Sequence, residues 1–124
     1  MRFLSAEWFE AMDLAAGTVE VPAEIQVSVA QIVTDAPGGE LRWVLICEDG
    51  TCRIERSGSA TATVTLCSNH ATALAMATGR LAASRAVLGG DLTIGGDPMH
   101  LVTATAALDL LGPAFAAVGE KLDA

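Results

Sequence analysis

Residues 40–56 read ELRWVLICEDGTCRIER, and this stretch decides the fold. Its centre, Asp49-Gly50, is a dipeptide that favours a two-residue hairpin turn, because both turn positions need a positive φ. Apolar side chains occupy alternate positions before and after the turn, so one face of the strand pair is apolar. They are Leu41, Trp43, Leu45 and Cys47 in the first run and Cys52 and Ile54 in the second. The stretch predicts an antiparallel strand pair over residues 40–48 and 51–56.

The segments on either side of this pair extend the pattern. Residues 25–34 alternate with the same period of two, and residues 61–67 alternate threonine with apolar side chains, so each predicts a strand. Residues 6–16 have helical spacing, with Ser5 as the expected N-cap and Gly17 as the expected end. We therefore expect one helix followed by four consecutive strands in an antiparallel meander.

The C-terminal half of the chain is predicted to be mostly helical. Ser68 is the expected N-cap of a helix that runs to about Thr78. Residues 82–88 predict a shorter helix, which Gly89-Gly90 ends, and residues 92–94 predict a brief last strand. The sheet would thus gain its fifth strand after the two helices.

Two helices are expected after this strand. Asp97-Pro98 combines an N-cap with a proline at the first helical position and predicts a helix to Leu111. Gly112-Pro113 is expected to end that helix and to begin a final amphipathic one over residues 113–122. Because a glycine precedes it, we expect this last helix to act as a hinged lid.

The 124 residues suit one domain over residues 1–124, since a chain of this length buries about two-thirds of its unfolded surface around one core. The predicted elements give an α+β fold. A sheet with one apolar face must be covered, and the helices are the available cover.

Composition excludes several classes of function. With 52% hydrophobic residues and a mean hydropathy of +0.46, the chain is not a disordered one. Its net charge of -8 would repel nucleic acid and anionic membranes. The continuous apolar runs are too short for an integral membrane segment, and Glu7 and Glu10 interrupt any secretory signal, so we expect a cytoplasmic protein.

One motif resembles a known family. Residues 86–97 read AVLGGDLTIGGD, in which glycines flank a short strand and an aspartate caps the next helix. With the strand ATVTL at 62–66 and Gly79-Arg80-Leu81, the stretch from Ala60 to Leu101 resembles the sterol carrier protein 2 (SCP2) family of lipid-binding domains. The resemblance implies a five-stranded, mostly antiparallel sheet covered on one face by helices. It also implies an apolar tunnel between the layers for a sterol, fatty acid or fatty acyl-CoA.

A lipid tunnel needs apolar walls, because an unpaired polar group beside an alkyl chain is costly. Apolar spacing alone does not distinguish a lined cavity from a filled core, so ordinary packing is the alternative for each candidate. Met76 and Met99 are favoured as walls, since thioethers adapt to variable ligands. The candidate ligand-binding residues are Trp43, Leu45, Leu74, Met76, Leu81, Leu92, Met99, Val102, Leu108, Leu111 and Phe115.

The sequence contains no motif for catalysis. His70 and His100 each fall in the first turn of a predicted helix, where they are interpreted as surface or cap histidines. Asp97 is explained by capping, and no nucleophile elbow or metalloprotease helix occurs. We therefore expect a protein that is not an enzyme and needs no cofactor.

The three cysteines could be in one of three chemical states. Free buried thiols are favoured, since an odd number does not pair fully. A disulfide between Cys47 and Cys52 is one alternative, and a zinc site that adds Cys67 and His70 is another, although its spacing is loose. No metal is therefore expected.

Two functions follow from the whole sequence. The first is non-catalytic binding or transport of a small lipid. The alternative is an accessory or interaction module that pairs with an enzyme or with a second copy, and carries no ligand. The sequence does not separate the two.

Overall fold

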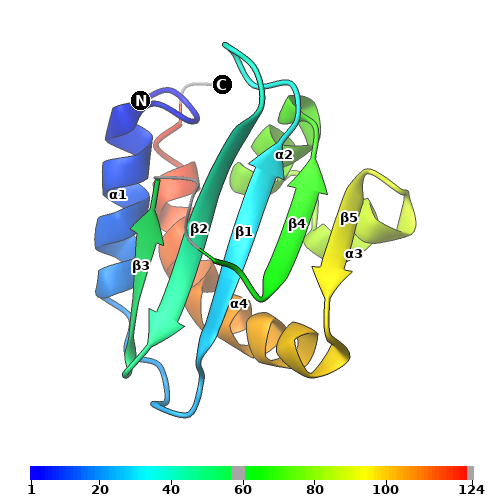
Figure 1. The fold of residues 1–124 in the computed structure, drawn as a ribbon. Coiled ribbons are helices and arrows are strands. Elements are labelled where there is room, and N and C mark those ends of the chain that lie inside the picture. The colour runs from blue at the N-terminus through cyan, green and yellow to red at the C-terminus, as the bar shows by residue number, and fades with distance from the viewer. Residues whose placement is uncertain (57–60, 123–124) are drawn as a thin grey trace.

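A computed structural model of the chain describes residues 1–56 and 61–122. In the view of Figure 1, the long C-terminal helix crosses behind the sheet and the first helix stands beside its left edge. Both helices pack against the same face of the sheet, so the predicted α+β fold with helices on one face is confirmed. In chain order the elements are α1 (Ala6–Gly17), β1 (Val27–Val33), β2 (Leu41–Glu48), β3 (Thr51–Glu55), β4 (Val64–Ser68), α2 (His70–Ala77), α3 (Ala83–Leu88), β5 (Leu92–Gly96) and α4 (Pro98–Gly119).

The sheet has five strands in the order β3-β2-β1-β4-β5. β1 and β4 are parallel, whereas the other three pairings are antiparallel, so the mostly antiparallel sheet is confirmed. The predicted four-strand meander is wrong, because the chain crosses from β3 to the far side of β1. β1 suits this central place, since Val29 and Ala30 point to opposite faces and both are buried. β3 exposes Arg53 and suits an edge.

The hairpin between β2 and β3 follows its prediction. Asp49 and Gly50 have φ angles of 53° and 83°, as the two-residue turn requires. Cys47 and Cys52 are cross-strand partners in the register that results. The alternation that predicted the shared apolar face was therefore interpreted correctly.

The helix caps agree with the sequence at two of three expected positions. The Ser5 hydroxyl accepts a hydrogen bond from the Trp8 N–H at 3.2 Å, and the Asp97 carboxylate accepts one from the Met99 N–H. The N-cap of α2 is Asn69 rather than Ser68. Ser68 instead ends β4, where its carbonyl accepts a hydrogen bond from the Thr34 N–H at 3.0 Å.

α4 is a single helix of 22 residues, so the predicted break at Gly112-Pro113 is wrong. Pro113 removes one hydrogen bond from the helix, but residues on both sides of it, Leu111 and Val118, are buried. Tertiary packing thus holds the helix through the proline. The lid predicted for residues 113–122 lacks the hinge on which that prediction depended.

The interior consists of two clusters of buried residues. The sheet–α4 cluster joins Val27, Val29, Leu45 and Val64 of the sheet to Ala104, Ala107 and Leu111 of α4. The aromatic cluster contains Trp8 and Phe9 of α1, Val33 and Trp43 of the sheet, Ala73 of α2 and Val118 of α4. Along β1, the first cluster ends at Val29 and the second begins at Val33.

α4 is also long and apolar enough to cross a membrane by length and composition. It is the one such helix in residues 1–56 and 61–122. Its inner residues Ala104, Ala107 and Leu111 pack in the sheet–α4 cluster, as a core helix does. Its place behind the sheet in Figure 1 therefore accounts for its inner residues, whereas Met99, Val102 and Leu110 of the same helix are exposed.

Candidate functional site

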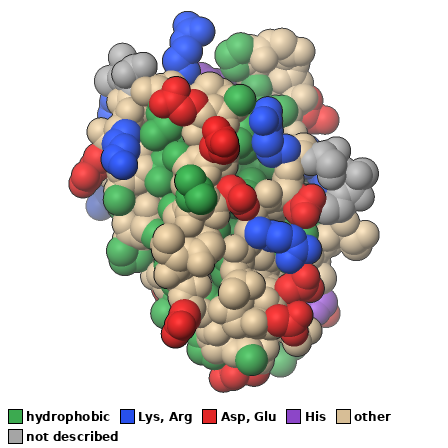
Figure 2. All heavy atoms as spheres, turned by 90° about the vertical axis from the view of Figure 1, so that its left-hand side faces the viewer, with side chains coloured by type: hydrophobic (Ala, Val, Ile, Leu, Met, Phe, Trp, Pro, Cys, Tyr) green, Lys and Arg blue, Asp and Glu red, His purple; other side chains and the backbone are tan. Residues whose placement is uncertain are grey.

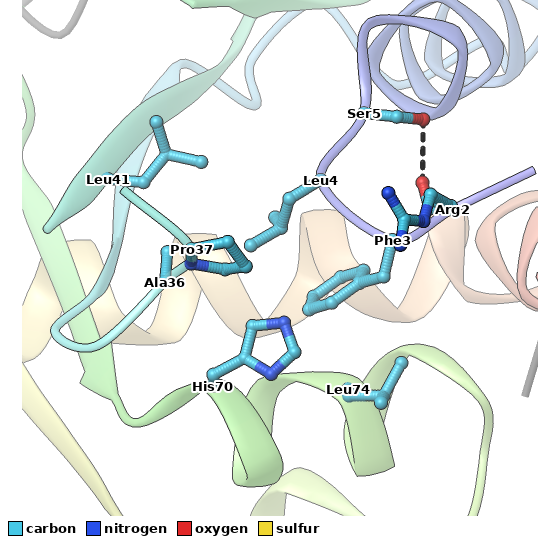
Figure 3. Close-up of a pocket in the computed structure, with 9 residues that line it drawn as sticks. All are labelled: Arg2, Phe3, Leu4, Ser5, Ala36, Pro37, Leu41, His70 and Leu74. Carbon is cyan, nitrogen blue, oxygen red and sulfur yellow. Dashed lines mark hydrogen bonds between the residues drawn. The ribbon is translucent and has the colours of Figure 1, made fainter. Parts of the chain in front are cut away.

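The larger of the two cavities described has a volume of about 660 Å³ and lies where the N-terminal segment passes the start of α2. Figure 3 shows Phe3, Leu4, Pro37 and His70 converging on this N-terminal pocket. The Ser5 N–H donates to the Arg2 carbonyl at 3.1 Å, and Leu4 has a φ of 66°, which turns the segment back. Its lining residues are Arg2, Phe3, Leu4, Ser5, Ala36, Pro37, Leu41, His70 and Leu74.

The N-terminal pocket has a mixed chemical character. The His70 ring lies 5.5 Å from the Phe3 ring, and the His70 backbone N–H donates to the Asp35 carboxylate. Arg2 adds an exposed cation, whereas most other lining side chains are apolar. The pocket is open to solvent and could hold part of an amphiphile, but it is not a tunnel between the layers.

A second place of interest lies between the two buried clusters. Gln31, Leu66 and Ile94 are register partners on β1, β4 and β5, and they share the helix-facing side of the sheet with Val29 and Val33. We call them the interior row. Gln31 and Leu66 are partly exposed and Ile94 is 44% exposed, although helices cover this face. The helices therefore do not seal the sheet along this row, and its exposure is largest at β5.

The side of the molecule around α1 and β3 has a different surface. Figure 2 shows acidic and basic side chains interspersed there with apolar ones. On β3, Arg53 pairs with Glu48 at 2.8 Å and with Glu55 at 3.3 Å. This side of the molecule therefore presents a mixed rather than an apolar surface.

The structure distributes the predicted wall residues over several environments. Leu45 and Leu111 are buried in the sheet–α4 cluster, and Leu108 and Phe115 pack against it while partly exposed. Trp43 is buried in the aromatic cluster, and Leu92 is buried on β5. Leu74 lines the N-terminal pocket, and Met76 and Leu81 are partly buried. Met99 and Val102 are 74% and 71% exposed on α4.

Some functional candidates were missed from the sequence. The N-terminal pocket is formed by residues 2–5 and by the connection after β1, which have no periodic pattern to reveal them. Gln31 did leave a signal, because it interrupts the alternation of Val27, Val29 and Val33. A polar residue inside an apolar alternation was thus the available clue to the interior row.

The cysteines are free thiols in the structure, with Cys47 and Cys52 buried and Cys67 partly exposed. Burial, followed by the hydrogen bond with Cys52, raises the pKa of Cys47 above its ordinary value of 9.0. Within the described ranges, no group of three or more His, Cys, Asp or Glu side chains is placed to hold a metal.

We expect stability to fall in alkaline solution because of this pair. The Cys47 thiol resists ionisation when folded, so only the unfolded chain loses that proton readily, and the free energy of unfolding should decrease as pH rises above 9.0. Urea titrations at neutral and alkaline pH would measure the decrease. Cys67→Ala should retain it, whereas Cys47→Ala should reduce it. Equal pH dependence in both variants would contradict the assignment.

The match of a family model now connects this fold to known proteins. The model of the SCP-2 sterol transfer family matches residues 13–109. The chain belongs to this family. Membership supports lipid binding or transfer as the general function, and it confirms the resemblance seen in the glycine-flanked strand. No curated protein sequence matches the chain.

Solved structures of the family share the fold. Sterol carrier protein domain 2 of Helicoverpa armigera is 18% identical with a TM-score of 0.65, and the match covers 95% of this chain and 90% of that one. Palmitated SCP2L2 from Aedes aegypti is 19% identical with a TM-score of 0.63, covering 90% and 95%. The sec-alkylsulfatase Pisa1 from Pseudomonas sp. is 17% identical with a TM-score of 0.55, covering 71% of this chain but 13% of the sulfatase. The fold thus occurs in solved chains of similar length and within a longer sulfatase chain.

Proposed function

We propose that this cytoplasmic protein binds a small lipid between its sheet and its helices and transports it without changing it chemically. The observation that carries the proposal is the interior row. Leu66 and Ile94 face the helices and yet keep part of their apolar surface exposed. Covering apolar surface stabilises a complex by about 25 cal/mol per Å². A hydrocarbon chain bound along this row would therefore be stabilised by covering the apolar surface that the helices leave exposed.

Several predicted wall residues could form the opposite side of such a site. Leu81, Leu108 and Phe115 come from the helical layer and are each partly exposed. None of them carries a polar atom on its side chain, so they would accept an alkyl chain without loss of hydrogen bonds. Trp43, in contrast, is enclosed by α1 and would support the site only through packing.

A second candidate function is the accessory module. Met99, Val102 and Leu110 are exposed along one face of α4, at spacings that bring them together on a helix. Exposed apolar stripes of this kind often contact a partner protein. The occurrence of the fold inside a longer sulfatase chain favours the same function. In that case the partner would be an enzyme or a second copy, and no lipid would be carried.

Lipid extraction and two filling variants test the proposal. We expect the purified protein to release a lipid into organic solvent, and to bind a pyrene-labelled fatty acid or fatty alcohol saturably. Leu66→Trp should reduce the affinity about tenfold or more, because the indole would occupy the space beside the interior row. Leu74→Trp is the matched control, since it fills the N-terminal pocket instead.

The contrary outcomes distinguish the two binding places and the two candidate functions. Loss of affinity in Leu74→Trp alone would move the lipid to the N-terminal pocket. An empty extract with no uptake of either probe would overturn lipid binding and favour the accessory module. Circular dichroism of both variants would show whether each one keeps the fold.

A further inference from the structure

Two polar side chains stand on the helix-facing side of the sheet among apolar neighbours. They are Gln31 on β1 and Ser68 on β4. Gln31 pairs in register with Leu66, and Val33 pairs with Ser68, so the two polar residues are diagonal neighbours on one face. Strands lie about 4.8 Å apart and two residues advance about 6.6 Å, so one small group could contact both side chains.

The Ser68 hydroxyl has no hydrogen-bond partner within the part of the chain that the structure describes. Ser68 is only 5% exposed, and its register partners Val33 and Leu92 are buried and apolar. A buried hydroxyl without a partner is unfavourable, and an alanine would pack there without that cost. Since Ser68 does not cap α2, capping does not explain the hydroxyl either.

Gln31, on the neighbouring strand β1, is the second polar side chain among apolar neighbours on this face. It interrupts an alternation of valines on the central strand, and its side chain forms no hydrogen bond within residues 1–56 and 61–122. Its partial exposure means that solvent reaches part of this residue although helices cover this face. A glutamine amide offers both donors and an acceptor, and a serine hydroxyl offers one donor and acceptor sites.

We propose that Gln31 and Ser68 together bind the uncharged hydroxyl group of the lipid. The inference rests on the proposed lipid-binding function and specifies the ligand class, a lipid with a neutral hydroxyl headgroup. The helix-facing residues of β1, β2, β4 and β5 include no charged side chain. An ionised carboxylate placed there would lose its hydration without gaining a cation, whereas a hydroxyl can donate to the amide oxygen and accept from Ser68.

The experiment compares cetyl alcohol with palmitate, which differ at the headgroup, as competitors of a pyrene-labelled fatty alcohol. We expect the unmodified protein to bind cetyl alcohol about tenfold more tightly than palmitate. Ser68→Ala and Gln31→Leu should each weaken the binding of cetyl alcohol about three- to tenfold, which is the value of one hydrogen bond. Neither substitution should change the affinity for palmitate. Thr65→Ala is the matched control, because it removes a hydroxyl from the opposite face of β4.

A structural role would be recognised by a separate measurement. The lipid-free Ser68→Ala protein should unfold at the same temperature as the unmodified protein or at a higher one, since an unpartnered hydroxyl is removed. A lower unfolding temperature, an equal loss for alcohol and acid, or unchanged affinities in both variants would overturn the hydroxyl site alone. Absence of binding by either probe in the unmodified protein would overturn the proposed function first.

Discussion

Gly119→Ala should destabilise the protein by about 3 kcal/mol, because no space exists for a side chain where α4 passes α2. A Cβ at Gly119 would overlap the backbone carbonyl oxygen of Ala77, the last residue of α2, and a backbone atom cannot move aside as a side-chain end could. The two helices would have to separate. Thermal and urea unfolding would measure the loss.

A second glycine in α4 provides a control substitution with the opposite expected effect on stability. Gly112 also lies inside α4, but a Cβ there meets nothing within 4 Å. Gly112→Ala should therefore stabilise the protein by about 0.5–1 kcal/mol, since alanine favours the helix and restricts the unfolded chain. If both substitutions destabilised the protein equally, the close approach of Gly119 to Ala77 would not be the cause.

Trp43→Ala should cost about 3–5 kcal/mol, the loss typical of a large buried aromatic side chain. Trp43 is 3% exposed, and its ring forms edge contacts with Trp8 at 5.7 Å and with Phe9 at 5.4 Å between centroids. Arg56 in turn lies over the Phe9 ring at 4.6 Å. Removal of the indole would leave a cavity at the centre of this cluster, and calorimetry would record it.

A conservative variant distinguishes a packing role of Trp43 from a role in lining the lipid site. Trp43→Phe should lose less stability and leave lipid affinity unchanged, because the aromatic cluster would keep a ring at this position. A fall in lipid affinity of Trp43→Phe at unchanged stability would show instead that the indole contacts the ligand. Met99→Ala, on the exposed surface of α4, should change stability by less than about 0.5 kcal/mol.

Sequence reasoning predicted local structure well where one residue determines it. The Asp49-Gly50 turn and the Ser5 and Asp97 caps depend on the backbone within a few residues, and all were correct. The pairing of β4 with β1 was missed, since alternation shows which face a strand buries but not which strand it joins. Gly112-Pro113 suggested a break that long-range packing prevents.

The site was less predictable than the fold for a related reason. Apolar spacing selected Leu45 and Leu111, which fill the core, as readily as Leu108 and Phe115, which remain partly exposed. The difference depends on how far the helical layer stands from the sheet at each position, and no local pattern encodes that. Gln31 was visible as an exception to the alternation, whereas Ser68 was interpreted as a helix cap, and the proximity of the two depends on the β1–β4 register.

The parallel pairing of β1 with β4 also has a consequence for how the chain folds. The hairpin of β2 and β3 closes over two residues and can form within microseconds, whereas Val29 meets Val64 only after the intervening chain has closed into a loop. β5 has no strand to join until β4 is in place, because β4 is its neighbour in the sheet. We infer that formation of this ladder commits the sheet to its native strand order.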